Sequence, residues 1–401
     1  MKILVINTGS SSIKYQLFDM KKQKVMVSGL AEKIGEETSF LEHEIMDDNG
    51  ESRKKEENEP IADHRQGLNR IVELLVDPEC GVISDKSEIA AVGHRVVHGG
   101  EAFQSSTVID DKVIDAIREN ISLAPLHNPP NLEGIEVSQS LFPDAPQVAV
   151  FDTAFHQTIP EKSYLYAVPY HLYTGHKVRR YGFHGTSHAY VAEEAANYLK
   201  NPLSELNLIT VHLGNGASIS AVQNGRCMDT SMGLTPLEGL VMGTRSGDVD
   251  PAIPFFLAKN LKLPFDEIDH LLNKESGLKG LCGTNDMREV EDRAAASDKK
   301  AQTAIDVYTY RIKKYMGSYF AAMGKLDAVV FTAGIGENSP LIRERSCENL
   351  EMLGIEIDEE KNRQKSKQNR DISTGRLPVK ILVIPTNEEK RIALETLDVV
   401  S

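Results

Sequence analysis

Residues 3–17 read ILVINTGSSSIKYQL, an apolar strand-like run, a turn of small polar residues and a second strand-like run. A similar pattern, LITVHLGNGASISAV, occupies residues 208–222. Aligning Gly9 with Gly214 allows one extra residue in the second copy, so that Ile13 aligns with Ile219. Two such units about half a chain apart predict a duplicated fold of two similar lobes with a cleft between them.

Three further apolar runs, at residues 148–151, 328–331 and 381–384, read as central strands, with helical patterns between them. This alternation favours an α/β architecture. Each run ends in polar or glycine residues, and in open α/β sheets ligands bind at the carboxyl ends of strands. We therefore expect the chemistry at those ends.

Helix signals are clearest in the second half of the chain. Amphipathic spacing predicts a helix over residues 303–323, and Ser339-Pro340 opens another helix that Gly354 closes. Residues 386–389, TNEE, form a capping box before a C-terminal helix. The acidic stretch 36–59 reads as an exposed hairpin.

Length and composition narrow the class of protein. A chain of 401 residues predicts two domains or more, and 26% charged with 40% hydrophobic residues is a globular balance. A net charge of -14 argues against nucleic-acid and anionic-membrane partners. No apolar run is long enough to span a membrane, so we expect a cytoplasmic protein. The four cysteines are widely separated and read as core or surface thiols.

Several glycine-rich turns are candidate phosphate sites. Residues 7–14, NTGSSSIK, join two strands, so they are not a Walker A loop, although small residues and Lys14 suit a phosphate. A solvated serine turn is the alternative. Residues 212–216, HLGNG, and 334–338, GIGEN, are ambiguous alone, but three such turns after three strands favour nucleotide binding.

Two arginines lie in glycine-bounded segments rather than on helices. Arg95 lies in GHRVVHGG (residues 93–100) and Arg245 in MGTRSGD (residues 242–248). A guanidinium group matches carboxylate and phosphoryl oxygens, and surface ion pairing is the alternative. His127 and His184 lie in loops before helices, where either could donate to an anion or be structural.

Two carboxylates follow strands. Asp152 ends one strand, and Glu388 lies in the first turn of the helix that follows another, where it can hold magnesium or stabilise the helix dipole.

These motifs resemble, in order and from end to end, the motifs of the acetate and propionate kinase family. The set also includes YGFHGTSH (residues 181–188) and TNEE (residues 386–389). The resemblance covers essentially the whole chain. It implies an α/β, duplicated two-lobe actin-like ATPase (ribonuclease H-like) fold and a cytosolic homodimer. It also implies domains at 1–154 plus 388–401 and at 155–387, the second binding the nucleotide and forming the dimer.

The resemblance also implies an activity and its residues. The activity is reversible phosphorylation of acetate by ATP with Mg²⁺, or Mn²⁺, giving acetyl phosphate. Asp152, Arg95, Arg245 and His184 would be catalytic, the last two stabilising the transition state, and Asn7 and Glu388 would bind the metal. Arg95, Val97, Leu126, Phe183 and Pro236 would bind the substrate. The nucleotide would be held by Lys14, His212, Leu213, Gly214, Asn215, Gly216, Asp286, Met287, Arg288, Gly334, Ile335, Gly336, Glu337 and Asn338.

Alternatives remain at this point. Propionate or another short carboxylate is a rival substrate, because one methylene group changes binding by only about 1–3 kcal/mol. An actin- or chaperone-like ATPase switch would leave the two arginines idle, and a sugar kinase would need a catalytic base. Two positions depart from the family pattern. Met287 stands where some family members carry an aromatic residue, and Lys390-Arg391 follows Glu389 where many members carry Ala-Arg-Asp.

Overall fold

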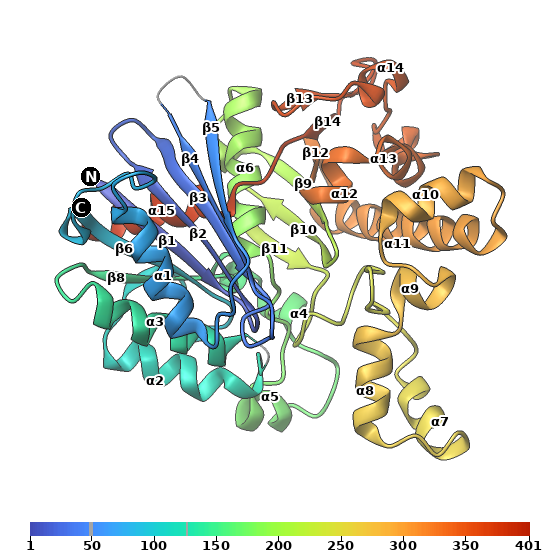
Figure 1. Ribbon diagram of the computed structural model, residues 1–401. Coiled ribbons are helices and arrows are strands. Elements are labelled where there is room, and N and C mark those ends of the chain that lie inside the picture. The colour runs from blue at the N-terminus through green and yellow to red at the C-terminus, as the bar shows by residue number, and fades with distance from the viewer. Residues whose placement is uncertain (48–50, 126) are drawn as a thin grey trace. The chain divides into compact units, whose positions relative to one another are not determined.

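The structure is a computed structural model that describes residues 1–47, 51–125 and 127–401. It divides into two compact units. Unit 1 comprises Met1–Phe155 and Asn387–Ser401, and unit 2 comprises His156–Thr386. Each unit has its own sheet (Figure 1).

The sheet of unit 1 has eight strands in the order β5-β4-β3-β2-β1-β6-β8-β7 within the described residues. The strands are β1 (Lys2–Thr8), β2 (Ser12–Asp19), β3 (Lys24–Glu32), β4 (Phe40–Met46), β5 (Ser52–Glu57), β6 (Ile89–Val96), β7 (Thr107–Val108) and β8 (Gln147–Phe151). The longer helices are α1 (His64–Val76), α2 (Asp111–Glu119), α3 (Asn128–Leu141) and α15 (Glu388–Val400).

The sheet of unit 2 has the order β11-β10-β9-β12-β14-β13. Its strands are β9 (Asn207–Leu213), β10 (Ala217–Gln223), β11 (Arg226–Thr230), β12 (Ala328–Thr332), β13 (Arg370–Asp371) and β14 (Lys380–Val383). Its helices are α4 (Glu161–Tyr164), α5 (His171–His176), α6 (Gly185–Leu199), α7 (Ala252–Asn260), α8 (Phe265–Lys274), α9 (Gly277–Cys282), α10 (Met287–Ala295), α11 (Lys299–Met323), α12 (Ala333–Asn338), α13 (Pro340–Cys347) and α14 (Glu359–Arg363).

The two sheets share one topology, which confirms the predicted duplication. In unit 1, β1, β2 and β3 form an antiparallel meander, and β6 and β8 continue the sheet parallel to β1. In unit 2, β9, β10 and β11 form the same meander, and β12 and β14 continue it parallel to β9. This repeated arrangement is the duplicated actin-like ATPase fold. It gathers the carboxyl ends of β1, β6 and β8, and separately those of β9, β12 and β14, at one edge of each sheet.

The expected alignment after the two turns is wrong by two residues. Gly9 N–H donates to Ser12 O and Gly214 N–H donates to Gly216 O, so the two glycines do correspond. Ile13, however, pairs with the residue before Gly9, and Ala217 pairs with the residue before Gly214. Ile13 therefore matches Ala217 rather than Ile219, because the second turn is one residue shorter and not longer.

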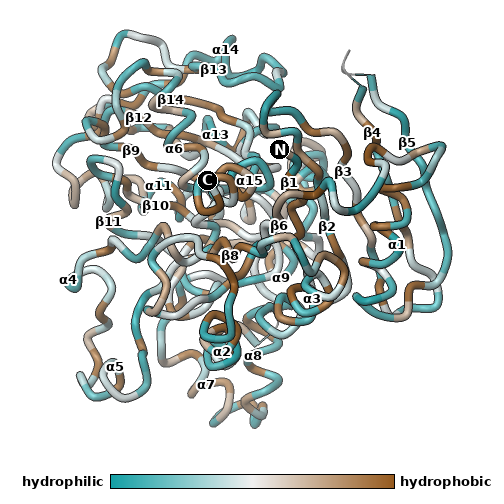
Figure 2. Tube along the Cα trace, turned by 90° about the vertical axis from the view of Figure 1, so that its left-hand side faces the viewer, coloured by the Kyte–Doolittle hydropathy of each residue, from teal (hydrophilic) through white to brown (hydrophobic). Residues whose placement is uncertain are grey.

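Apolar strands form the cores of both units. β8, β9 and β12 are buried along their whole length, and Figure 2 shows them as mostly hydrophobic, whereas β5 is hydrophilic. In unit 1, helices α1 and α3 cover one face of the sheet. On the other face, Ile392 and Ala393 of α15 join a buried cluster with Ile3 and Val5 of β1. The red helix α15 therefore lies against the blue strands of Figure 1.

The helix and hairpin predictions hold, with local differences. The helix expected at 303–323 is α11, which begins four residues earlier because Asp298 caps it. Ser339 caps α13, but the helix ends at Cys347 before a separate turn reaches Gly354. Asn387, not Thr386, caps α15 by accepting from Lys390 N–H.

Within the acidic stretch, β4 and β5 pair as an antiparallel hairpin, and the connecting residues 48–50, which include Asn49-Gly50, lie outside the described residues. All four cysteines are buried free thiols. None of the helices in the described ranges combines the length and apolarity that crossing a membrane requires.

Candidate active site

Arg95, Asp152 and Glu388 lie together at the carboxyl edge of the unit 1 sheet. Arg95 is near the end of β6, Asp152 directly follows the neighbouring parallel strand β8, and Glu388 begins α15. Arg95 Nη2 donates a hydrogen bond to Asp152 Oδ2, and Arg95 Nε lies 3.6 Å from Glu388 Oε2. Three residues that are distant in sequence thus form one charged cluster.

Burial controls the electrostatics of this cluster. Burial opposes the charge on Arg95, but the carboxylates of Asp152 and Glu388 outweigh it and raise the pKa of the guanidinium group. Burial also raises the pKa of the Glu388 carboxyl to about 7, against the opposing charge of Arg95 and helped by nearby Asp152 and Glu389. Arg95 Nε is buried and donates no hydrogen bond to any described residue. A bound carboxylate or phosphoryl oxygen would satisfy that donor.

The donor set of the cluster fits a magnesium ion. Mg²⁺ is commonly held by one or two carboxylates together with substrate phosphates and waters, and Asp152 and Glu388 supply two carboxylates. The raised pKa of Glu388 marks a carboxylate that a further cation would stabilise. Asn7, at the end of β1, pairs in register with Lys14 of β2, whose Nζ lies 2.6 Å from Glu389 Oε1.

Val97 lies in the loop after β6, and α3 holds this loop in place. Val97 N–H donates to Asn131 Oδ1 at 3.1 Å, and Asn131 Nδ2 donates to Thr8 O at 2.8 Å. Asn128 exchanges hydrogen bonds with both backbone groups of His98. His127 precedes α3, and Leu126 lies outside the described residues. The position of Val97 is therefore fixed relative to the ends of β1 and β6.

In unit 2, His184 and His212 stack beside the glycine turn that follows β9. Their ring centroids are 4.3 Å apart and the rings are 17° from parallel. His184 precedes α6 in a left-handed conformation, with φ 58° and ψ 25° and no side-chain cap bond. Such a conformation costs of order 1–3 kcal/mol and is typical of functional sites. A Cβ at Gly216 would lie 3.3 Å from His184 Nε2 and 3.7 Å from Arg245 Nη1, so both side chains face this turn.

Arg245 is a largely buried cation without a carboxylate partner among the described residues. Its Nη1 donates to Pro236 O at 3.1 Å, and burial alone lowers its pKa. A desolvated guanidinium group without a counter-ion is an anion site, since a bound anion would restore its lost interactions.

Several contacts fix the loop that carries Arg245. Glycine at position 277 allows the start of α9 to pack against the backbone of this loop, because a Cβ there would lie only 2.2 Å from Met242 O. Arg311 donates to Gly239 O at 3.0 Å and to Asp248 O at 3.1 Å. Tyr315 Oη donates to Asp248 Oδ2 at 2.8 Å. The guanidinium group is thus held on a well-supported backbone.

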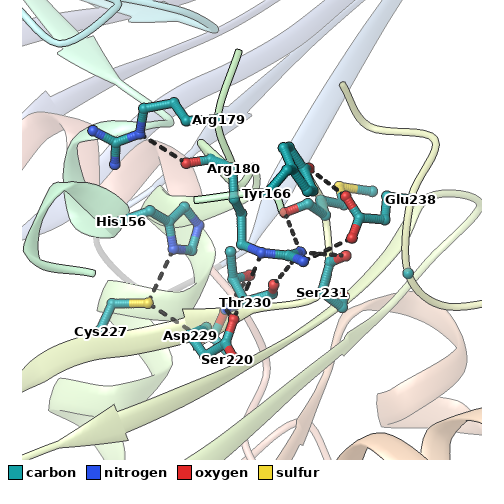
Figure 3. A network of polar contacts seen from close by, with 12 residues as sticks. His156, Tyr166, Arg179, Arg180, Ser220, Cys227, Asp229, Thr230, Ser231 and Glu238 are labelled. Carbon is teal, nitrogen blue, oxygen red and sulfur yellow. Dashed lines mark hydrogen bonds and ion pairs between the residues drawn. The ribbon is translucent and has the colours of Figure 1, made fainter. Parts of the chain in front are cut away.

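A second arginine fixes the segment that contains Pro236 (Figure 3). Arg180 Nη1 donates to Thr230 O at 2.8 Å and to Ser231 O at 3.2 Å. Its Nη2 donates to Glu238 Oε1 at 2.7 Å, and Tyr166 Oη donates to the other carboxylate oxygen. Because Pro236 O accepts from Arg245, this network also helps to orient that arginine.

A cavity of about 640 Å³ opens beside the glycine turn of unit 2. Its walls come from the turn after β9, the start of α10 and helix α12. The lining residues are Gly214, Asn215, Asn285, Asp286, Met287, Arg288, Glu291, Gly334, Ile335, Asn338 and Ser339. The structure thus brings most of the nucleotide-binding candidates around one space.

The other nucleotide candidates are not among the residues that line this cavity. Lys14 is in unit 1, and the cavity lining does not include His212, Leu213, Gly216, Gly336 or Glu337. Leu213 is fully buried in β9, so it offers no exposed surface to a ligand. Glu337 Oε1 accepts from Thr386 N–H at 3.1 Å, and burial raises its pKa, both of which indicate a structural role.

Three lining residues were missed by the sequence analysis: Asn285, Glu291 and Ser339. Asn285 Nδ2 donates to Asn215 Oδ1 at 3.0 Å and ties α10 to the glycine turn. Ser339 Oγ donates to Glu291 Oε1. Ser339 was recognised only as a helix cap, and Glu291 is one helical turn beyond Met287, a spacing that could have pointed to it.

The fold and these clusters define a class, the phosphotransferases built on the duplicated actin-like fold. Comparison with known proteins shows to which family within this class the chain belongs. The model of the acetokinase family matches residues 2–394, and the chain belongs to this family of phosphotransferases with a carboxyl group as acceptor.

The similarity extends over whole chains. The chain is 56% identical over 405 residues to the acetate kinase of Desulfotalea psychrophila, covering 100% of both. It matches the crystal structure of Porphyromonas gingivalis acetate kinase with a TM-score of 0.94 and 46% identity, covering 100% of both chains. It also matches a propionate kinase from Francisella tularensis with a TM-score of 0.91 and 44% identity over 99% of both chains.

Proposed function

We propose that this protein phosphorylates acetate reversibly with ATP and Mg²⁺, by direct in-line transfer to give acetyl phosphate. The observation that carries the proposal is Arg245, a largely buried guanidinium group that faces the glycine turn with no carboxylate partner among the described residues. Phosphoryl transfer needs alignment and charge stabilisation more than covalent chemistry. The uncompensated cation of Arg245 beside the glycine turn supplies the charge stabilisation.

Each unit contributes distinct groups. In unit 1, Arg95 binds the carboxylate through its unsatisfied Nε, and Val97 contacts the methyl group. In unit 2, Arg245 and His184 donate to the transferring phosphoryl group. The ATP base and ribose occupy the cavity lined by Asp286, Met287, Arg288, Gly334 and Ile335. An acetate oxygen is already ionised, so it attacks without a general base.

Glu388 and Asn7 hold the metal in this proposal, next to Asp152. When bound, Mg²⁺ neutralises phosphate charge, and Mn²⁺ offers similar chemistry. Asp152 also anchors Arg95, and its side chain is 1% exposed. A carboxylate so buried and paired is a poor nucleophile, which supports direct transfer over a phosphorylated aspartate.

Two measurements test the reaction. Trapping acetyl phosphate as its hydroxamate should give a product that depends on both ATP and acetate, whereas ATP hydrolysis without that product would favour an ATPase switch. With chiral phosphate, direct transfer predicts inversion of configuration, and retention would support a phosphorylated enzyme. A comparison of kcat/KM for acetate, propionate and butyrate tests acetate against propionate, which the similarity to a propionate kinase keeps as the main rival.

A homodimer in the cytoplasm completes the proposal, in line with the family resemblance. Helices α7 and α8 and their connection carry five exposed apolar side chains, which a partner copy would cover: Ile253, Phe255, Phe256, Leu261 and Phe265. Sedimentation should give a mass near 89 kDa, about twice the 44.3 kDa chain. The variant Phe256→Asp should shift it toward the monomer, and an unchanged mass would exclude this surface.

A further inference from the structure

A line of hydrogen bonds runs from His184 into the core of unit 2. His184 Nδ1 lies 2.9 Å from Ser218 Oγ, and the same oxygen lies 2.7 Å from His188 Nε2. The other nitrogen of His188, Nδ1, lies 2.7 Å from Thr210 Oγ1. The residues come from α6 and from the paired strands β9 and β10, and Ser218 and His188 are fully buried.

The number of protons on this line is limited. The Ser218 hydroxyl carries one proton but contacts two imidazole nitrogens, so it can donate to only one of the two rings, and at least one ring must donate to it. Burial, with His156 and His212 nearby, holds the pKa of His188 well below its ordinary value. His188 is therefore neutral and has a single N–H. A proton on His188 Nδ1 would require Ser218 to donate to His188, whereas a proton on His188 Nε2 leaves the Ser218 hydroxyl proton available for His184 Nδ1.

We propose that Ser218 is a positioning residue that, together with His188, keeps neutral His184 in the tautomer protonated at Nε2. In this arrangement His188 Nε2 donates to Ser218 and Thr210 donates to His188 Nδ1. Ser218 then donates to His184 Nδ1. The Nε2–H of His184 faces Gly216, beside Arg245, and is ready to donate to a phosphoryl oxygen. This inference rests on the proposed phosphoryl transfer.

The opposite direction conflicts with that function. It would put the proton of a neutral His184 on Nδ1 and turn the lone pair of Nε2 toward the anion. Charging the ring instead would place a second cation next to Arg245 and against the stacked His212 ring. His212, Arg245 and, through Ser218, His188 are among the groups that face His184. The Arg245 cation disfavours a charged His184 ring, and an anion bound beside Arg245 would favour a donor at Nε2.

Kinetics of two serine variants test the proposal. Ser218→Ala removes the link, whereas Ser220→Ala removes an equally buried hydroxyl two residues along β10, one that bonds to Thr230 Oγ1 and to no histidine. We expect Ser218→Ala to lower kcat about tenfold while the KM values for acetate and ATP change less than twofold, because a misplaced donor weakens the transition state selectively. Ser220→Ala should stay within twofold of wild type. Equal losses in both variants would overturn the proposal.

A spectroscopic measurement decides the tautomer without relying on activity. In full-length protein labelled with ¹⁵N-histidine, the His184 signals are identified by their loss in His184→Gln. We expect a protonated Nε2 and an unprotonated, hydrogen-bonded Nδ1, which loses its hydrogen bond in Ser218→Ala. A proton on Nδ1 in wild type, or an unchanged spectrum in the variant, would overturn the proposal.

The wild-type spectrum suffices if Ser218→Ala does not fold. If wild type gives the expected spectrum but no acetyl phosphate, the proposed function fails while the hydrogen-bonded line stands.

Discussion

Replacing Arg245 with alanine should separate catalysis from folding. In the described structure the guanidinium group has no carboxylate partner, and its main polar contact is the hydrogen bond to Pro236 O. Losing that bond costs about 1 kcal/mol, partly offset because a cation no longer has to be buried. Removal of one preorganised donor lowers kcat by about 10²–10³, equivalent to about 2.7–4 kcal/mol. We therefore expect a large loss of rate and a change of less than about 1 kcal/mol in the free energy of unfolding.

Arg95→Ala provides the contrast. It leaves the 1% exposed carboxylate of Asp152 without its arginine, and breaking a buried pair in this way costs about 3–5 kcal/mol. Hydroxamate kinetics and urea unfolding on both variants give the comparison, with the exposed Arg226→Ala of β11 as a control that should change neither. The reasoning is refuted if Arg245→Ala keeps near-normal turnover, or if it destabilises the protein as much as Arg95→Ala.

Three further predictions concern other parts of the site. The pKa of about 7 for Glu388 in the folded protein lies above its ordinary 4.5, so its contribution to stability is present below pH 4.5 and is lost as the pH rises toward 7. Glu388→Gln should remove this pH dependence of the free energy of unfolding, which is about 3 kcal/mol at most. Equal urea-unfolding curves for wild type and variant at both pH 5 and pH 8 would contradict it. Met287→Ala should raise the KM for ATP about tenfold and leave the KM for acetate unchanged, because the cavity loses a buried apolar side chain from its wall. An unchanged KM for ATP would show that Met287 does not bind the nucleotide. Val97→Ala should raise kcat/KM for propionate relative to acetate about tenfold, and a constant ratio would show that Val97 does not limit substrate size.

The sequence was informative where local patterns decide the structure. The five apolar runs lie in β1, β8, β9, β12 and β14, as expected for strands that are buried on both faces of a sheet. β6 was not expected, since Gly93, His94 and Arg95 interrupt its apolar character. Gly93 is required because Thr396 of α15 packs directly over it, and His94 and Arg95 bond to Gln147 and Asp152, contacts between distant segments that no local pattern contains.

The site could be predicted only in part, because it too depends on contacts between distant segments of the chain. Motif resemblance pointed to Arg95, Asp152 and Glu388, and the structure brings them together. It could not show that Ser218 lies between two histidines, because that contact depends on the register of β10 against β9. Likewise, the inward direction of Glu337 follows from its bond to Thr386 N–H, which lies 49 residues away.

The return of α15 to unit 1 has a consequence for how the protein is made on the ribosome. Ile392 and Ala393 complete the buried cluster around Ile3 and Val5, yet they are synthesised after every residue of unit 2. During translation, the first sheet must therefore wait with one apolar face uncovered while the second unit is already able to fold. A nascent chain stalled before residue 387 should expose that face to chaperones or proteases, although its first 155 residues have long been available.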